Sequence, residues 1–315
     1  MQKGRRRRRR LVLAVVSVCF GLGSASLAIA QKDPTGAAGL LELHRYREAK
    51  ALLEQAVRDD GRDIKAQYYL GRAYFALCEY DKAITAMRQA VQLQQDKALH
   101  HYWLGRAYGE KAKRVGTFKK ASLAAKIRKE FEQAVALDPR DAAARVALGN
   151  FYAQAPAFMG GGTRKALAQA AALTQLDPLR GELLAARIDE QEKEIARAAD
   201  RYKALAQQYA GSANAAVFFS AYGRFLFRQK RYNDAIEAFG EQLKRDPRNP
   251  GTRLRLAAAY EAADRPQDAE AQYRQVAAVS ARCVPVKYRR AGSGQAPTPG
   301  STHQVGALGP RPMSP

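Results

Sequence analysis

The sequence is poor in cysteine and histidine and has no long runs of alternating β-branched residues. Three cysteines and four histidines occur among 315 residues, with no Cys-x-x-Cys pair and no histidine pair at helical ligand spacing. These absences argue against a zinc site and against a framework of disulfides. We expect Cys78 and Cys283 to be unpaired, because Cys283 opens a tail rich in glycine, proline and serine. The missing alternation argues against a β-sheet protein.

The common catalytic motifs are missing as well. The sequence contains no glycine-rich phosphate loop ending in Gly-Lys-Ser/Thr, no His-Glu-x-x-His and no Gly-x-Ser-x-Gly. Glu190, Glu192 and Glu194 alternate with Gln191 and Lys193, which predicts a solvated helix face rather than an acid–base pair. The sequence therefore predicts that the protein is not an enzyme and holds no metal ion and no cofactor.

Acidic residues are absent from both ends of the chain. All 30 of them lie between residues 31 and 282, whereas the 53 basic residues extend into both ends. The whole chain has a formal net charge of +23, and the segment 31–282 keeps a charge of +12. Such a surplus favours acidic partners or anionic surfaces. Its spread over a long segment argues against nucleic acid as the main partner.

Residues 1–30 have the three-part layout of a secretory signal peptide. Arg5 to Arg10 precede an uncharged, mostly apolar stretch from Leu11 to Ala30, which ends in small residues before Gln31. This layout predicts cleavage after Ala30 and a periplasmic or secreted body. The alternative is an uncleaved membrane anchor at residues 11–30, because the apolar stretch is about long enough to span a bilayer.

One short motif recurs along the chain. Residues 68–74 read YYLGRAY and residues 102–108 read YWLGRAY, an offset of 34 residues. Looser copies are VALGNFY at 146–152 and AYGRFL at 221–226. A fixed period of this length indicates a repeat protein rather than a single compact fold.

A second pattern follows each copy of the motif. A small residue is followed four positions later by a large or apolar residue, and three positions after that by another small or apolar one. This spacing puts each set on one stripe of a helix. The sets are Ala49/Leu53/Ala56, Ala83/Met87/Ala90, Ile127/Phe131/Ala134, Ala166/Ala170/Leu173, Ala198/Tyr202/Leu205, Ala235/Phe239/Gln242 and Ala269/Tyr273/Val276.

Both patterns resemble the tetratricopeptide repeat family, whose unit reads W-x2-L-G-x2-Y, then A-x3-F, then P. The resemblance covers about residues 34–282 and is strongest at 64–141. It implies an all-α, right-handed superhelical solenoid of about seven antiparallel helix pairs, in a domain of residues 31–282. A single pair cannot bury its apolar face alone, so the pairs must stack. Residues 283–315 are predicted to be a disordered tail, since 13 of the last 25 residues are Gly, Pro or Ser.

Two of the expected repeats carry insertions. One spans residues 110–121 and is predicted to lengthen both helices and the turn between them. The other, PAFMGGG at 156–162, is predicted to be a turn, with Thr163 as the N-cap of the next helix. Within it, Phe158 and Met159 are candidate contacts for a partner.

In this family the first helix of each pair lines a concave groove. The resemblance implies that the residue after each motif glycine faces the groove, with neighbours one helical turn away. Arginine forks and aromatic faces in such positions suit carboxylate ligands. The groove is similar to that of carboxylate-clamp members, which rely on Lys and Asn, although only Asn150 matches them. The candidate groove residues are Tyr68, Arg72, Phe75, Tyr102, Arg106, Asn150, Arg224, Phe227 and Arg228.

The sequence thus favours a non-catalytic, exported scaffold that binds a protein or peptide through an acidic or C-terminal segment. Two alternatives stay open. The groove arginines can pair with glutamates inside the solenoid, or the basic body can bind a polyanion or a membrane surface in the cell envelope. Apart from that alternative, membrane contact is expected only through an uncleaved N-terminal segment. No particular oligomeric state is predicted.

Overall fold

The computed structural model describes residues 34–285 and residue 288. This part of the chain contains fourteen α-helices, two short 3-10 helices and no strand. The signal-peptide prediction for residues 1–30 and most of the predicted tail lie outside the described residues. The helices are α2 (Pro34–Glu42), α3 (Tyr46–Asp59), α4 (Ile64–Ala76), α5 (Tyr80–Leu93), α6 (Ala98–Ala112), α7 (Thr117–Leu137), α8 (Ala142–Gln154), η1 (Ala157–Met159), α9 (Thr163–Thr174), α10 (Pro178–Gln191), α11 (Ile195–Tyr209), α12 (Ala215–Arg228), α13 (Tyr232–Arg245), α14 (Pro250–Ala262), α15 (Pro266–Val279) and η2 (Ala281–Cys283).

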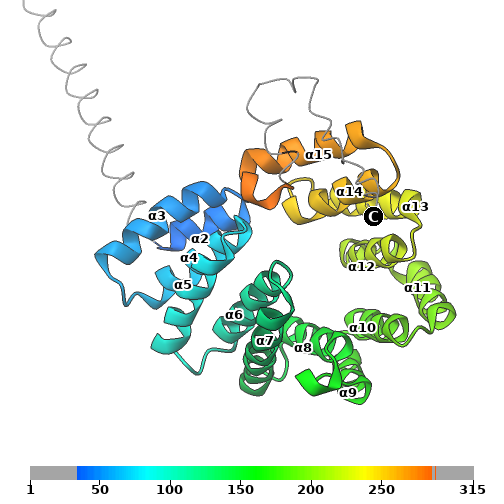
Figure 1. Ribbon diagram of the computed structural model, residues 1–315, viewed down its shortest axis with the longest axis horizontal. Coiled ribbons are helices and arrows are strands. Elements are labelled where there is room, and N and C mark those ends of the chain that lie inside the picture. The colour runs from blue at the N-terminus through cyan, green and yellow to red at the C-terminus, as the bar shows by residue number, and fades with distance from the viewer. Residues whose placement is uncertain (1–33, 286–287, 289–315) are drawn as a thin grey trace, which may run out of the picture.

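The helices form seven antiparallel pairs that stack in chain order, from α2 with α3 to α14 with α15 (Figure 1). Each helix packs mainly against the helices before and after it in the chain. The stack curves so strongly that α15 and η2 return to the neighbourhood of α2 and α4 (Figure 1). The prediction of an all-α solenoid of about seven helix pairs is confirmed.

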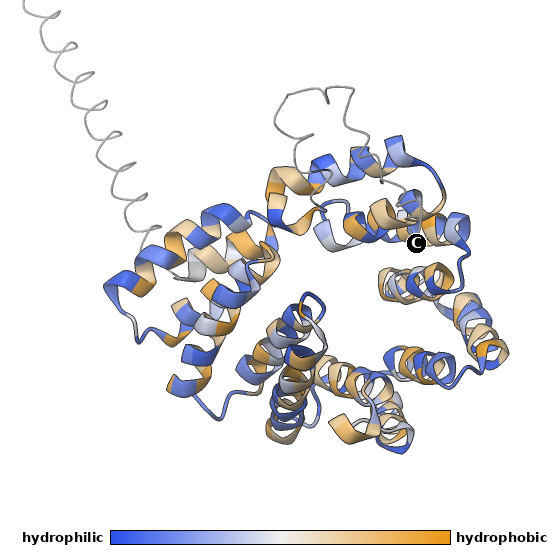
Figure 2. Cartoon of the chain, viewed as in Figure 1, coloured by the Kyte–Doolittle hydropathy of each residue, from blue (hydrophilic) through white to orange (hydrophobic). Residues whose placement is uncertain are grey.

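The helices are amphipathic, and Figure 2 shows apolar and polar residues sharing most of them. The stripes expected from the second pattern are buried between neighbouring helices, as Leu53, Met87, Phe131, Phe239 and Tyr273 illustrate. Burial of such side chains is the main favourable term in folding, at about 1.5–3 kcal/mol for each large apolar side chain. The apolar residues that recur in each repeat are therefore the ones that stabilise the packing between neighbouring helices.

Glycine in the first helix of a pair makes room for a ring from the second helix. A Cβ atom at Gly105 would lie 2.6 Å from the ring of Phe131, and one at Gly223 would lie 2.7 Å from the ring of Phe239. Real Cβ atoms do not approach other atoms this closely, so the two backbones can come together only where the motif places glycine. This contact explains why the Gly and the aromatic residue occur as a pair in the repeat.

Five of the seven pairs share one kind of three-residue turn. Its middle residue has a positive φ of 56–67° and is not glycine, and the next amide donates a hydrogen bond to a carbonyl five residues earlier, as in Glu79 N–H to Tyr74 O. This is the Schellman arrangement that ends helices. The middle residues are His44, Cys78, Lys193, Lys230 and Asp264. Cys78 therefore lies at the edge of the solenoid, at the turn between α4 and α5.

The two insertions expand the remaining turns. Helix α7 has 21 residues and α6 has 15, as expected from the insertion at 110–121. The second insertion contains η1 and ends at Gly162, which is the N-cap residue of α9. Thr163 is instead the first residue of that helix, and its hydroxyl donates to Glu192 Oε1 over 2.5 Å. The prediction of a Thr163 cap was wrong because the helix begins directly after the glycines, one residue earlier than expected.

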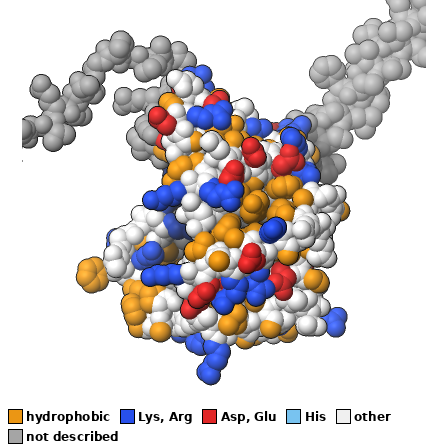
Figure 3. Space-filling model, turned by 90° about the vertical axis from the view of Figure 1, so that its right-hand side faces the viewer, with side chains coloured by type: hydrophobic (Ala, Val, Ile, Leu, Met, Phe, Trp, Pro, Cys, Tyr) orange, Lys and Arg blue, Asp and Glu red, His pale blue; other side chains and the backbone are white. Residues whose placement is uncertain are grey.

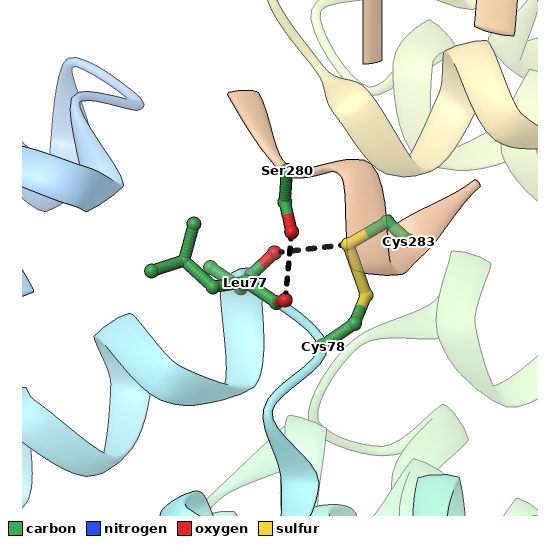
Figure 4. The surroundings of a disulfide bond; sticks show 5 residues. Leu77, Cys78, Ser280 and Cys283 are labelled. Carbon is green, nitrogen blue, oxygen red and sulfur yellow. Dashed lines mark hydrogen bonds between the residues drawn. A yellow bond between two sulfur atoms is a disulfide. The ribbon is translucent and has the colours of Figure 1, made fainter. Parts of the chain in front are cut away.

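The expectation that Cys78 and Cys283 are unpaired was wrong. They form a disulfide across a sequence separation of 205, with their Cα atoms 5.4 Å apart (Figure 4). Cys283 belongs to η2, which the curvature of the solenoid carries to the α4–α5 turn. Beside the bond, Ser280 and Val284 are both buried. Cysteine spacing could not predict the pairing, because the approach depends on the summed rotation of all the intervening repeats.

Candidate binding groove

Aromatic rings and guanidinium groups gather on the facing sides of α4 and α6. The Arg106 guanidinium lies 4.2 Å from the centre of the Trp103 ring and 4.7 Å from that of Phe75. Arg72 lies 5.1 Å from the same Trp103 ring, and Tyr102 lies 5.5 Å from Arg106. A cation over an aromatic face is worth about 0.5–1 kcal/mol where it is exposed. The aromatic faces hold both guanidiniums in place without contributing a negative charge.

This cluster of rings and guanidiniums on α4 and α6 contains all the groove residues predicted from the first two motif copies. It also contains Trp103, which the sequence-based prediction missed. Tyr68 belongs to it, but its ring is buried and lies 5.8 Å from Arg72, so it supports the arginine and does not face a ligand. Trp103 was not predicted, although it lies three residues before Arg106 and therefore on the same helical face. That spacing was the signal that could have identified it.

Further along the solenoid, residues of α6, α8, α10 and α12, with Tyr202 of α11 and Gln242 of α13, line an open cavity of about 610 Å³. Of the predicted residues, Tyr102, Asn150, Arg224 and Arg228 line it, whereas Phe227 does not and packs against Tyr232 instead. Arg180 and Arg187 were missed because α10 carries no Gly-Tyr motif from which its register could be counted. Other lining residues that were not predicted are Lys113, Tyr202 and Ser220, which lie on or next to other helices.

A buried carboxylate neutralises part of this cavity. Glu190 accepts hydrogen bonds from Arg228 at 2.5 and 2.6 Å and from Arg187 at 2.8 Å. Glu190 is only 8% exposed, so the prediction of a solvated face was wrong for it, although Glu192 and Glu194 are exposed. For Arg228 the alternative of internal pairing is therefore the one observed.

Of the other groove arginines, one pairs with a carboxylate of the described solenoid and two do not. Arg72 pairs with Glu42 at 3.2 Å, whereas Arg106 and Arg224 have no carboxylate partner among the described residues. Arg224 donates only to the carbonyl of Ser220 in its own helix, at 3.1 Å. Two guanidiniums thus remain free to bind an anion.

The electrostatics of the cavity favour an anion. The Arg224 side chain lines the cavity and keeps contact with solvent, while the packed walls around it partly desolvate the guanidinium. This desolvation, together with the charges of Arg255, Arg228 and Arg187, lowers its pKa to about 10. Burial also lowers the pKa of Arg255, with a contribution from Arg106. Arg224 remains charged at neutral pH, so a bound carboxylate or phosphate would relieve the repulsion among these arginines.

The outer surface differs from the cavity in its charge pairing. Figure 3 shows basic and acidic side chains side by side on the face that includes α11 and α13. The described pairs there include Arg197 with Asp189 and Arg231 with Asp234. On this face, neighbouring carboxylates therefore compensate part of the positive charge.

The predicted partner contact at the second insertion is exposed. The Phe158 side chain is 83% exposed and Met159 is half-buried. The first insertion has a similar feature, since Phe118 near the start of α7 is 96% exposed. These two rings are the most exposed of the large apolar side chains described, and they lie outside the cavity.

Replacing Glu190 by glutamine tests the charge balance of the cavity wall. Burial alone would raise the pKa of Glu190, but the hydrogen bonds and charges of Arg228 and Arg187 outweigh it and hold the pKa below its ordinary value. Because the folded pKa lies below the unfolded one, this stabilisation is present at neutral pH and is lost as pH falls through the folded pKa. We expect Glu190→Gln to lower the free energy of unfolding by about 2 kcal/mol at pH 7.

Urea unfolding of the parent and of Glu190→Gln at pH 7 and pH 3 measures this effect. The difference between them should shrink at pH 3, where the parent carboxylate is closer to protonation. The exposed Glu194→Gln is the matched control and should change the free energy by less than about 0.5 kcal/mol at both values. An equal loss of unfolding free energy in both variants would contradict the stabilising role that we assign to Glu190.

The groove is suited to binding. Among the described residues, no group of His, Cys, Asp and Glu is arranged to hold a metal ion. None of the helices in that part of the chain is long and apolar enough to cross a membrane. What the site offers is a concave wall of helices with aromatic faces and two uncompensated guanidiniums. Together these features define an all-helical repeat protein with a concave inner face.

The repeats assign this class to a family. A sequence model of the tetratricopeptide repeat matches residues 40–106 and 226–285. With the seven stacked helix pairs, this match identifies the chain as a tetratricopeptide repeat protein. No curated protein matches the chain in sequence.

Solved structures of the same fold are similar to this chain at low identity. TTC0263 of Thermus thermophilus, described as a thermophilic tetratricopeptide repeat protein, is 18% identical, over 73% of this chain and 98% of its own, with a TM-score of 0.46. YrrB, described as having an unusual peptide-binding site, is 19% identical over 58% of this chain and 90% of its own, with a TM-score of 0.44. A monomeric mutant of IFIT1 with Gppp-AAAA is 17% identical over 78% of this chain, with a TM-score of 0.51, and this chain spans 54% of it.

Proposed function

We propose that the protein is an exported, non-catalytic scaffold whose inner face binds an acidic segment of a partner protein. Tetratricopeptide repeats provide a protein-interaction fold, which supports the scaffold role. The observation that carries the choice of ligand is the pair of uncompensated guanidiniums, Arg106 and Arg224, on inner faces of the solenoid. Export is supported by the disulfide, because such bonds persist mainly in oxidising compartments outside the cytoplasm.

Binding of a defined acidic peptide tests the proposal. The probe is a fluorescent polyglutamate peptide, with a polyglutamine peptide of the same length as its neutral control. We expect the double variant Arg106→Ala/Arg224→Ala to raise the Kd for polyglutamate at least about tenfold. Loss of one charge-assisted hydrogen bond costs about 1.5–3 kcal/mol, and each ~1.4 kcal/mol is tenfold in affinity.

The matched control removes two arginines from the outer turns. Arg231 and Arg265 are exposed and pair with Asp234 and Asp268 in their own helices. The variant Arg231→Ala/Arg265→Ala has the same net charge as the groove variant, so it should bind polyglutamate as the parent does. Equal loss in both variants would mean that net charge alone drives binding, and the groove proposal would fail.

A polyanion is the second candidate ligand. The IFIT1 structure of this fold contains Gppp-AAAA, and the present chain carries a net charge of +23. Polyanion binding releases counterions and falls steeply with salt, by several powers of ten for many phosphate contacts. Binding of a single-stranded RNA oligomer that exceeds polyglutamate binding at about 200 mM salt would favour this second candidate.

A further inference from the structure

The last helix pair of the described solenoid is joined to the second one. The Cys78–Cys283 disulfide links the α4–α5 turn to η2, and beside it the Ser280 hydroxyl donates to the carbonyl of Leu77 over 2.8 Å (Figure 4). That hydrogen bond is buried. A tetratricopeptide stack would ordinarily have two free ends, so here the curvature has been closed into a ring (Figure 1).

The bond makes a closed covalent loop of residues 78–283. This loop carries every helix from α5 to α15, and the cavity lies inside it, lined from opposite sides by residues such as Tyr102 of α6 and Asp246 after α13. A chain that passes through the cavity would therefore be encircled by covalent bonds. A partner could reach the cavity from the side only if the seam between Cys78 and Cys283 opened.

The disulfide is the covalent tie across the seam. Beside it lie the Ser280–Leu77 hydrogen bond, a 3.5 Å contact of Cys283 Sγ with the carbonyl of Ala76, and a 3.7 Å approach of His44 Nε2 to Asp246 Oδ1. Extensive helix packing follows chain order and does not join α2–α5 to α14 or α15. The seam also carries more cations than acids. Arg282 shares one cleft with Arg47 and Lys50 and another with Lys82, Lys111 and Arg114. The acids of those clefts are Glu54, Glu79 and Asp81, and they pair with Lys50, Lys82 and Lys111.

We propose that the ring takes an extended acidic segment through its centre, entered from a free chain end, and that the disulfide is the latch that retains it. This inference rests on the proposed function, since it assigns the form of the partner to the same groove. With the bond formed, a folded domain is too large for the cavity of about 610 Å³ that lies within the ring, so it cannot pass through. With the bond broken, the cation-rich seam separates and the groove becomes open from the side.

Opening requires a dithiol reductant. Its thiolate attacks one sulfur of the Cys78–Cys283 bond, the other cysteine leaves as a thiolate and takes up a proton, and a mixed disulfide forms. The second thiol of the reductant, deprotonated, then attacks the mixed disulfide and releases the first cysteine. Two electrons and two protons pass to the protein, which gains two thiols, and the dithiol becomes a disulfide.

A topological experiment tests the latch. The probe is a polyglutamate segment of about twenty residues, about 66 Å long when extended, carrying a small folded domain at one end or at both. The protein with its disulfide intact should bind the one-domain probe and bind the two-domain probe at least about tenfold more weakly. The variant Cys78→Ser/Cys283→Ser should bind both probes equally. Ser280→Ala keeps both cysteines and should behave as the parent does.

The outcomes separate the two proposals. Equal binding of both probes by the disulfide-bonded parent would overturn the threaded ring while leaving the groove intact. Failure of the parent to bind even the one-domain probe would overturn the groove and the latch with it. Binding of the one-domain probe by the cysteine variant shows that this variant is folded. Weaker binding of the two-domain probe by the same variant would therefore also contradict the latch.

Discussion

Replacing Cys78 and Cys283 by serine is expected to lower the free energy of unfolding by about 3 to 5 kcal/mol. The bond closes a loop across a sequence separation of 205, and the loss of chain entropy in the unfolded state grows with loop length. Equilibrium unfolding in guanidinium chloride measures the change. Reduction of the parent should give the same loss, and a change of less than about 1 kcal/mol would show that the bond constrains little.

The same substitution should act unevenly along the chain. In a linear stack each terminal repeat has one neighbour, so its local stability is low. Once the ring is open, amides of α14 and α15 should be accelerated more than those of α6 to α8, which change only as far as the global free energy of unfolding falls. Ser280→Ala removes the hydrogen bond at the seam and keeps the disulfide, and it is expected to cost only about 1 kcal/mol. Uniform acceleration along the chain would contradict a local role for the closure.

Phe239→Ala is expected to cost about 3–5 kcal/mol of stability. Its ring is 1% exposed and fills the space that Gly223 leaves on the facing helix, so truncation creates a cavity at the contact on which the repeat is built. Equilibrium unfolding monitored by circular dichroism measures the loss. Because α12 and α13 belong to one apolar cluster with α10, α11 and α14, we expect the transition of that half to shift first.

Phe158→Ala is the matched control for this prediction. It deletes the same atoms from a ring that is 83% exposed, so its effect on stability should stay within about 0.5 kcal/mol. A comparable loss in both variants would mean that the Gly–Phe contact is not what holds the pair together. Loss of partner binding without loss of stability would instead support Phe158 as a contact residue.

Much of the groove could be placed from the sequence because it follows the helical repeat. Counting from the motif glycine brought Arg72, Arg106 and Phe75 into one cluster, as the structure shows. The same counting failed on α10, where the motif is absent, and so Arg187 and Arg180 were missed. Phe227 was misplaced because the three-residue step from Arg224 carried it onto the side of α12 that packs against Tyr232 of α13.

The state of each charge could not be read from the sequence. Glu190 looked like one acid in a solvated series, yet it is buried between Arg187 and Arg228. Arg228 lies on another helix, 38 residues away, and only the packing of α10 against α12 brings the two together. For the same reason, nothing in the motif distinguished the paired Arg228 from the unpaired Arg224.

The sequence by itself determined the helices, their pairing and the order of the stack. These depend on contacts between residues three or four positions apart and between neighbouring repeats, and such contacts leave a period in the chain. Only the tertiary structure decided which helix pairs far apart in the sequence come together, because small rotations between successive pairs add up over the whole stack. That sum places Cys283 beside Cys78 and turns an open groove into a closed ring.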